Sequence, residues 1–332
     1  MIRSFYTLFY IVLFTFFSLT ISPAKAATPM GLMTGGLQGT YYQFGLNLKE
    51  LMKNNGIDLT VLNSNGSVSN VYAVYKRPGT QMGIVQSDVL AFVAKVEKDP
   101  VLKKIAQKMR MVFPLYNEEI HLVGNKDVTS FDELQGKNVA IGKEGSGTYL
   151  TAKLLFKVSG IQPANMINIG TADALTKLKE GKVDAMFYVA GYPVKLFTEQ
   201  ISASDNLHVV PIENKAIVDF YPESEIPGST YSWQTESVNS VAVKAVLVSY
   251  NFRNTQCKNV GRFRVLLKNN LEWLKKNGHP KWRSVDLDYP LKGWEQYDCV
   301  KKRLYTTPVE PPVEPPLKQE DNPILDAIKK ML

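Results

Sequence analysis

The stretch Thr34-Gly35-Gly36-Leu37-Gln38-Gly39-Thr40-Tyr41 ends in a Gly-Thr-Tyr tripeptide that returns at the end of Gly142-Lys143-Glu144-Gly145-Ser146-Gly147-Thr148-Tyr149. Each stretch follows an apolar segment, and helical spacing of apolar residues begins after it. A strand that passes through glycines into a helix exposes unpaired N–H groups at the positive end of the helix dipole. Such a turn can hold an anion. Two of these turns predict two similar lobes that face one ligand.

Strand and helix patterns alternate on both sides of each turn. The first run predicts strands at 30–33, 58–62 and 82–85. It predicts three helices: one at 40–54, one that Ser67 caps, and one at 89–96 that Ser87 or Asp88 caps. The second run predicts strands at 139–141, 166–169 and 185–189, with helices at 149–159 and 172–180. This order predicts a duplicated α/β fold in which each lobe is a mostly parallel sheet flanked by helices.

Other segments carry the chain between the lobes. The patterns at 109–116 and 121–123 indicate crossing strands, 241–248 indicates one or two buried strands interrupted at Lys244, and 258–277 indicates a long helix. We therefore expect a discontinuous first lobe (27–120 plus 220–305), a second lobe (121–219) and a tail (306–332). The tail joins a polyproline spacer at 308–316 to a short helix that begins at Asn322-Pro323. This helix is expected to dock on the body or, alternatively, to contact a partner.

Residues 1–26 have the features of a cleaved signal peptide. Arg3 gives a positive start, an apolar run covers 5–21, and Ala24-Lys25-Ala26 is a small-x-small cleavage site near Ala26. An uncleaved membrane anchor is the alternative. No later stretch is apolar enough to span a bilayer, so we expect a mature protein in the periplasm or another extracytoplasmic space.

The charge and cysteine content fit an exported protein. The formal charge of +8 falls by two when Arg3 and Lys25 leave, and no basic block or aromatic platform indicates nucleic-acid binding. Cys257 and Cys299 are the two cysteines. In an oxidising compartment they predict one disulfide, with two free thiols as the alternative.

Catalytic patterns are missing from the sequence. The three histidines, His121, His208 and His279, have no metal-ligand spacing. There is no Gly-x-Ser-x-Gly elbow, P-loop or dinucleotide fingerprint. We therefore expect a protein that is not an enzyme and that needs no metal or cofactor.

Binding chemistry is better represented, although each glycine turn alone could simply be a tight strand-to-helix connection. Ser146, Gly147 and Thr148 offer hydroxyls and N–H groups suited to a carboxylate or phosphate, and Lys143 lies beside them. Other candidates follow the strands at the edge where α/β proteins hold ligands. Gln86 and Asp88 could accept hydrogen bonds from an amine or hydroxyl, although Asp88 fits a helix cap equally well. The full candidate set is Thr34, Gly35, Gly36, Gly39, Thr40, Tyr41, Ser67, Gln86, Asp88, Gly145, Ser146, Gly147, Thr148, Tyr188 and Gly191.

Several motifs, taken in order, resemble one receptor family. They are Thr34-Gly-Gly-x-x-Gly-Thr-Tyr-Tyr42, Asn65-Gly-Ser-Val-x-Asn70, Val85-Gln-Ser-Asp88, Gly145-Ser-Gly-Thr148, Gly181-x-Val-Asp-Ala185 and Gly191-Tyr-Pro193, with later matches at Tyr221-Pro222 and Ile226-Pro-x-x-x-Tyr231. Over about residues 28–275 the chain resembles the TAXI-type solute receptors of TRAP transporters. The resemblance implies a two-lobed fold of the type II periplasmic-binding-protein kind. It also implies capture of a small organic anion, such as a glutamate-like amino acid or 2-oxoglutarate, for delivery to a membrane permease.

Two departures from the family pattern bear on function. Lys143-Glu144 replaces the smaller residues usual before Gly145, which affects the charge that a ligand would meet. The tail and the cysteine pair lie outside the shared region. Two other roles stay open: a sensor that partners a membrane signalling protein, or an enzyme whose base would be Asp88, Glu144 or Asp184.

Overall fold

The computed structural model describes residues 27–95, 99–291, 293–294, 296–297 and 322–332. The signal-peptide prediction for 1–26, the polyproline spacer and Cys299 with its expected disulfide lie outside these residues. Cys257 itself is buried in a helix of the first lobe.

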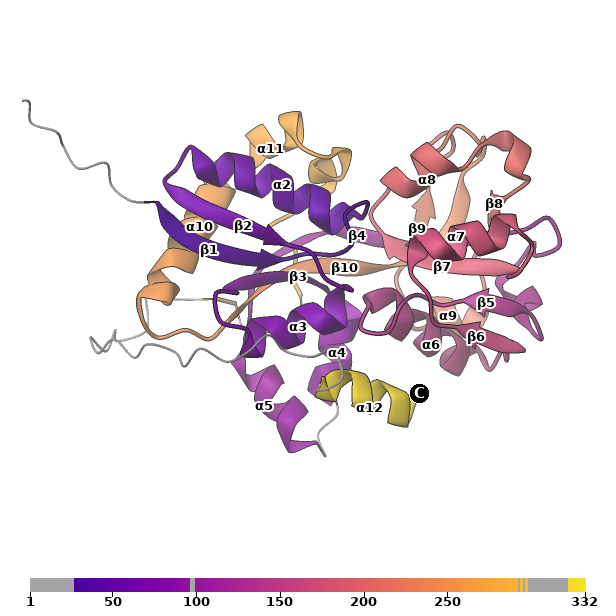
Figure 1. Ribbon diagram of the computed structural model, residues 1–332, viewed down its shortest axis with the longest axis horizontal. Helices are drawn as coiled ribbons and strands as arrows, with labels where there is room; N and C mark the ends of the chain where they lie inside the picture. Colours follow the sequence, from indigo (N-terminus) through magenta and orange to yellow (C-terminus); the bar gives the residue numbers. More distant parts are fainter. Residues whose placement is uncertain (1–26, 96–98, 292, 295, 298–321) are drawn as a thin grey trace, which may run out of the picture.

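One curled sheet runs through both lobes, in the strand order β2-β1-β3-β10-β4-β7-β5-β6 (Figure 1). The first lobe holds β1 (Thr28–Met33), β2 (Ile57–Leu62) and β3 (Met82–Gln86). The second lobe holds β5 (Asn138–Ala140), β6 (Asn165–Ile167), β7 (Ala185–Ala190) and β8 (His208–Val209). Within each lobe the pairings β1–β2, β1–β3, β5–β6 and β5–β7 are parallel. The predicted pair of parallel α/β lobes is confirmed.

Two long antiparallel strands join the lobes. They are β4 (Met109–Gly124) and β10 (Val238–Tyr250), which pair with each other, and β9 (Glu223–Ile226) adds to β10. The two separate strands expected at 109–116 and 121–123 are one strand, and 241–248 belongs to one unbroken strand. The interruption expected at Lys244 is present as a register shift between Lys244, which pairs with Asn117, and Val246, which pairs with Pro114.

Helices cover both faces of the sheet. The first lobe has α2 (Thr40–Lys53), α10 (Thr255–Asn269) and α11 (Leu271–Asn277) on one face, and α3 (Ser67–Lys76), α4 (Ser87–Lys95) and α5 (Pro100–Lys108) on the other (Figure 1). The second lobe has α6 (Gly147–Ser159), α7 (Thr171–Lys179), α8 (Lys195–Gln200) and α9 (Lys215–Val218). Helix ends followed the sequence closely; Gly160, with φ 76°, ends α6 in the left-handed conformation as predicted.

Three details differ from the expectation. The long helix at 258–277 is two helices that break at Asn270, whose non-helical backbone ends α10. The N-cap of α3 is Gly66 rather than Ser67, which is the first helical residue. Helix α5 was not predicted, although Asp99 caps it and Pro100 occupies its first turn, a recognisable start signal.

The C-terminal helix α12 (Pro323–Met331) docks on the body, which was one of the two arrangements expected from the sequence. Ile324, Leu325 and Ile328 are buried in the core cluster that also includes residues of α3 and α5. Met331, at the end of the same helix, is 47% exposed. The helix also reaches the second lobe, because Lys157 Nζ donates to the Met331 carbonyl at 2.8 Å and Lys329 pairs with Glu144 at 2.7 Å.

Candidate functional site

A cavity of about 550 Å³ lies between the lobes, and four helices begin at its wall. The N-cap residues of α2, α3, α6 and α7 all line it; they are Gly39, Gly66, Ser146 and Gly170. The three glycines offer no side chain to cap their helices. First-turn N–H groups without a protein acceptor therefore stay available to a ligand, although the Ser69 N–H of α3 and the Tyr149 N–H of α6 already have acceptors. Each helix directs the positive end of its dipole at the cavity.

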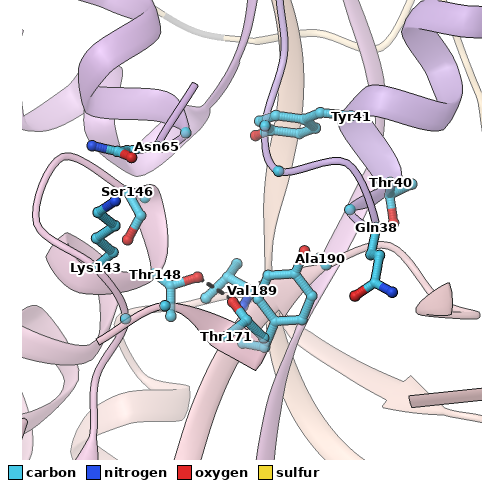
Figure 2. Close-up of a pocket in the computed structure, with 18 of the residues that line it drawn as sticks. Gln38, Thr40, Tyr41, Asn65, Lys143, Ser146, Thr148, Thr171, Val189 and Ala190 are labelled. Carbon is cyan, nitrogen blue, oxygen red and sulfur yellow. Dashed lines mark hydrogen bonds between the residues drawn. The ribbon is translucent and has the colours of Figure 1, made fainter. Parts of the chain in front are cut away.

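The two glycine-rich turns face each other across this cavity. Figure 2 shows Thr40 and Tyr41 on one side and Ser146 and Thr148 on the other. The first turn is tied to the second lobe, because the Thr40 hydroxyl donates to the Gly191 carbonyl at 2.7 Å. A side chain on Gly39 would meet the Tyr188 hydroxyl, so the close approach of the lobes requires glycine there.

The second turn owes its shape to two glycines with positive φ, Gly142 (89°) and Gly145 (86°). The Ser146 hydroxyl accepts from the Tyr149 N–H at 3.0 Å and caps α6. The Thr148 hydroxyl accepts from the Val189 N–H at 3.1 Å, which joins α6 to β7. Both hydroxyls thus have one structural partner each and keep their own protons available as donors. The N–H groups of Gly147 and Thr148 have no intrahelical partner.

The first lobe also holds the second turn directly. The Gly145 carbonyl accepts from the Ser69 N–H at 3.0 Å and from the Ser69 hydroxyl at 3.2 Å. Gly66, at the start of α3, has φ 121° and lies against the Ser146 backbone. Helices α3 and α6 therefore begin side by side, one from each lobe.

Buried polar side chains form the inner wall of the cavity. Gln86, at the end of β3, is 2% exposed, and Glu118, within β4, is 1% exposed. The Tyr41 hydroxyl donates to Glu118 Oε2 at 2.6 Å and lies 3.3 Å from the Ser67 hydroxyl. Burial raises the pKa of Glu118 well above its ordinary value. The hydrogen bond from Tyr41 lowers this pKa, and the nearby carboxyl of Asp88 raises it further.

Formal charges at the wall are few. Among the lining residues Lys143 carries the positive charge, while Glu118 and Asp173 are acids. Attraction for an anion therefore comes mainly from the four helix N-termini rather than from basic side chains.

Most of the candidate residues from the sequence come together here. Those that line the cavity are Gly35, Gly36, Gly39, Thr40, Tyr41, Ser67, Gln86, Ser146, Gly147, Thr148 and Tyr188.

Four candidates lie outside the lining: Thr34, Asp88, Gly145 and Gly191. Thr34 is fully buried and fixes the first turn, since its hydroxyl donates to the Leu62 carbonyl at 2.9 Å. The carbonyls of Gly145 and Gly191 accept the bonds between lobes described above. Each of these three residues shapes the cavity without facing it.

The carboxylate of Asp88 accepts hydrogen bonds from other groups of the protein. Thr151 donates to its Oδ2 at 2.6 Å, and the Val89 N–H donates to its Oδ1 at 2.8 Å. The Tyr221 hydroxyl donates to Oδ2 at 3.4 Å. Burial raises the Asp88 pKa to about 6 despite these bonds. Asp88 is the second residue of α4, so it lies inside the first turn rather than at the expected cap position.

Sequence reasoning missed Glu118 and the fourth helix start at Gly170-Thr171. Gly170 precedes a helical pattern and could have been found by the same rule as the other turns. Glu118 lies in a strand between Asn117 and a second acid, Glu119, where the sequence gives no sign of burial.

Within the ranges that the structure describes, no group of three or more His, Cys, Asp or Glu side chains could hold a metal ion. No helix within those ranges has the length and apolar character needed to cross a membrane.

The two lobes, the crossing strands and the shared cavity define a protein of the periplasmic-binding-protein fold. A model of the NMT1-like family matches residues 32–256, and the chain belongs to this family. MatC from Rhodopseudomonas palustris with bound malate has a similar structure: the TM-score is 0.51 at 15% identity, over 79% of this chain and 91% of that chain. This likeness confirms the expected fold.

Two further structures are similar at lower scores. The periplasmic binding protein BugD gives a TM-score of 0.49 at 13% identity, over 77% of this chain and 85% of its own. The periplasmic aliphatic sulphonate binding protein SsuA from Escherichia coli gives 0.44 at 13% identity, over 76% and 75%.

Proposed function

We propose that this protein is a non-enzymatic, extracytoplasmic solute receptor of the TAXI type. It captures a small organic anion, a glutamate-like amino acid or a dicarboxylate such as 2-oxoglutarate, between its lobes. It then delivers the solute to a TRAP-type membrane permease. The observation that carries the proposal is the convergence of four helix N-termini on one cavity formed by both lobes.

The solute's carboxylate lies on the N–H groups of Gly147 and Thr148, and the turn that ends at Thr40 opposes it from the first lobe. A micromolar affinity requires about −8 kcal/mol. Several charge-assisted hydrogen bonds of roughly 1.5–3 kcal/mol each supply this amount before the losses on binding. Rotation of the lobes about β4 and β10 would admit and enclose the solute.

Ser146 provides a matched pair of variants for testing the anion site. Asp and Asn both cap helices well, so Ser146→Asp and Ser146→Asn should each preserve the start of α6. The aspartate adds a negative charge where the solute's carboxylate is placed. Calorimetry with L-glutamate and 2-oxoglutarate should show affinity at least about tenfold lower for Ser146→Asp than for Ser146→Asn.

Native mass spectrometry of freshly purified protein should identify the bound acid. We expect a mass increment from one small organic acid that is lost on denaturation. Protein that carries no solute and binds neither probe by calorimetry would contradict the proposed function. The intact mass should also show that residues 1–26 have been removed.

A further inference from the structure

Glu118 has one carboxylate oxygen without a donor. Its Oε2 accepts from the Tyr41 hydroxyl at 2.6 Å, whereas no group among the described residues donates to Oε1. The side chain is 1% exposed and belongs to the wall of the cavity. Because Glu118 lines the cavity, this acceptor oxygen is a place suited to a ligand's donor.

Lys281, a cation that acts on Glu118, is already engaged. Lys281 Nζ lies 2.8 Å from both oxygens of Glu119, and it lies 3.5 Å from the ring centre of Tyr192. The other ionisable groups that act on Glu118 are acids or phenols: Asp88, Glu119, Tyr41, Tyr116 and Tyr188. None of these supplies a positive charge, so the distant charge of Lys281, which is bonded to Glu119, is what opposes them.

We propose that Glu118 is a specificity-determining residue that accepts a hydrogen bond from an ammonium or hydroxyl group on the solute. This inference rests on the proposed function, because the solute's carboxylate is placed on the helix N-termini. The receptor then selects acids that carry a donor beside the carboxylate over acids of the same length without one. The role that sequence reasoning gave to Asp88 falls to Glu118, which lies closer to the cavity.

Three probes with the same five-carbon skeleton test the proposal: L-glutamate, L-2-hydroxyglutarate and glutarate. By calorimetry, the wild-type protein should bind the first two at least about tenfold more tightly than glutarate, since a site built for a donor discriminates against its absence. In Glu118→Gln the amide can turn its own N–H groups toward the cavity, and the preference should fall to within about threefold. Glu50→Gln, the same change on an exposed part of α2, should keep the wild-type preference.

The outcomes separate the two claims. Wild-type protein that binds all three probes within about threefold of one another would overturn the role of Glu118 and leave the anion site standing. A folded Glu118→Gln variant that keeps the wild-type preference for L-glutamate and L-2-hydroxyglutarate over glutarate would also overturn the role of Glu118. Wild-type protein that binds none of the probes would contradict the proposed function itself. The wild-type ratio can still overturn the role of Glu118 when Glu118→Gln fails to fold.

Discussion

Gly147 lies directly against the carboxamide of Gln86, so that a Cβ atom on Gly147 would overlap the Gln86 side chain. One residue begins α6 in the second lobe and the other ends β3 in the first. The cavity wall is therefore closed where the two lobes touch, and this contact depends on the absence of a side chain at 147.

Gly147→Ala should destabilise the protein by about 1–3 kcal/mol, because the added methyl group forces Gln86 to move within a packed wall. Gly36→Ala is the matched control: it lies in the other glycine turn, and no atom lies within 4 Å of its added Cβ. Its effect should stay below about 0.5 kcal/mol. Urea unfolding measures both, and equal losses would contradict the contact.

Thr148→Val should cost about 1–3 kcal/mol, because the Val189 N–H loses its buried acceptor. Thr148→Ser keeps the hydroxyl and should lose much less. The same pair reports on solute binding, since valine also removes the hydroxyl proton available to a ligand. A Val variant as stable as the Ser variant would show that the α6–β7 bond contributes nothing.

Asp88 makes stability depend on pH. Its pKa rises from 3.8 to about 6 in the folded protein, so the folded state favours the protonated form. Stability is therefore lost as pH rises from about 4 through 6, by at most about 3 kcal/mol because the residue keeps some exposed surface. Asp88→Asn should remove this part of the profile. Urea unfolding at several pH values checks it, and parallel profiles for the two proteins would contradict the assignment.

Glu118 links solute binding to protons. Burial and the nearby carboxyls of Asp88 and Glu119 hold its pKa above the ordinary value, against the Tyr41 hydrogen bond and the Lys281 charge. An ammonium group at the open oxygen lowers that pKa, so L-glutamate should release protons on binding at a pH where Glu118 holds one. Calorimetry in two buffers of different ionisation enthalpy measures the release. Glutarate is the control and should release fewer protons; equal release would contradict the link.

Helix α12 should contribute to stability through one face. Ile328→Ala should cost about 2–5 kcal/mol, because Ile328 is fully buried in the shared core. Met331→Ala on the same helix should cost less than about 0.5 kcal/mol, since Met331 is 47% exposed. Thermal or urea unfolding compares them. Similar small effects would mean that α12 does not pack on the body in solution.

The sequence was most informative where structure is decided locally. The glycine turns, the Gly160 end of α6 and the apolar spacing of α2, from Tyr41 to Met52, depend on neighbours along one helix, and all are present. The fold class followed from the order of these elements.

Longer-range interactions decided the rest. Asp88 could be either a ligand or a cap, and the choice depended on Thr151, which lies in the other lobe. Glu118 is buried only because β4 passes between the lobes under Tyr41. Strand β4 is continuous through Pro114, which pairs with Val246 of β10 between two register shifts. No local pattern carries these facts.

A crystal structure of the protein with its solute is the most direct test of the central claim. The account predicts a carboxylate within hydrogen-bond distance of the Gly147 and Thr148 nitrogens, with the turn that ends at Thr40 contacting the same molecule. A solute that lies outside the cavity, or that touches only one of the two turns, would contradict it.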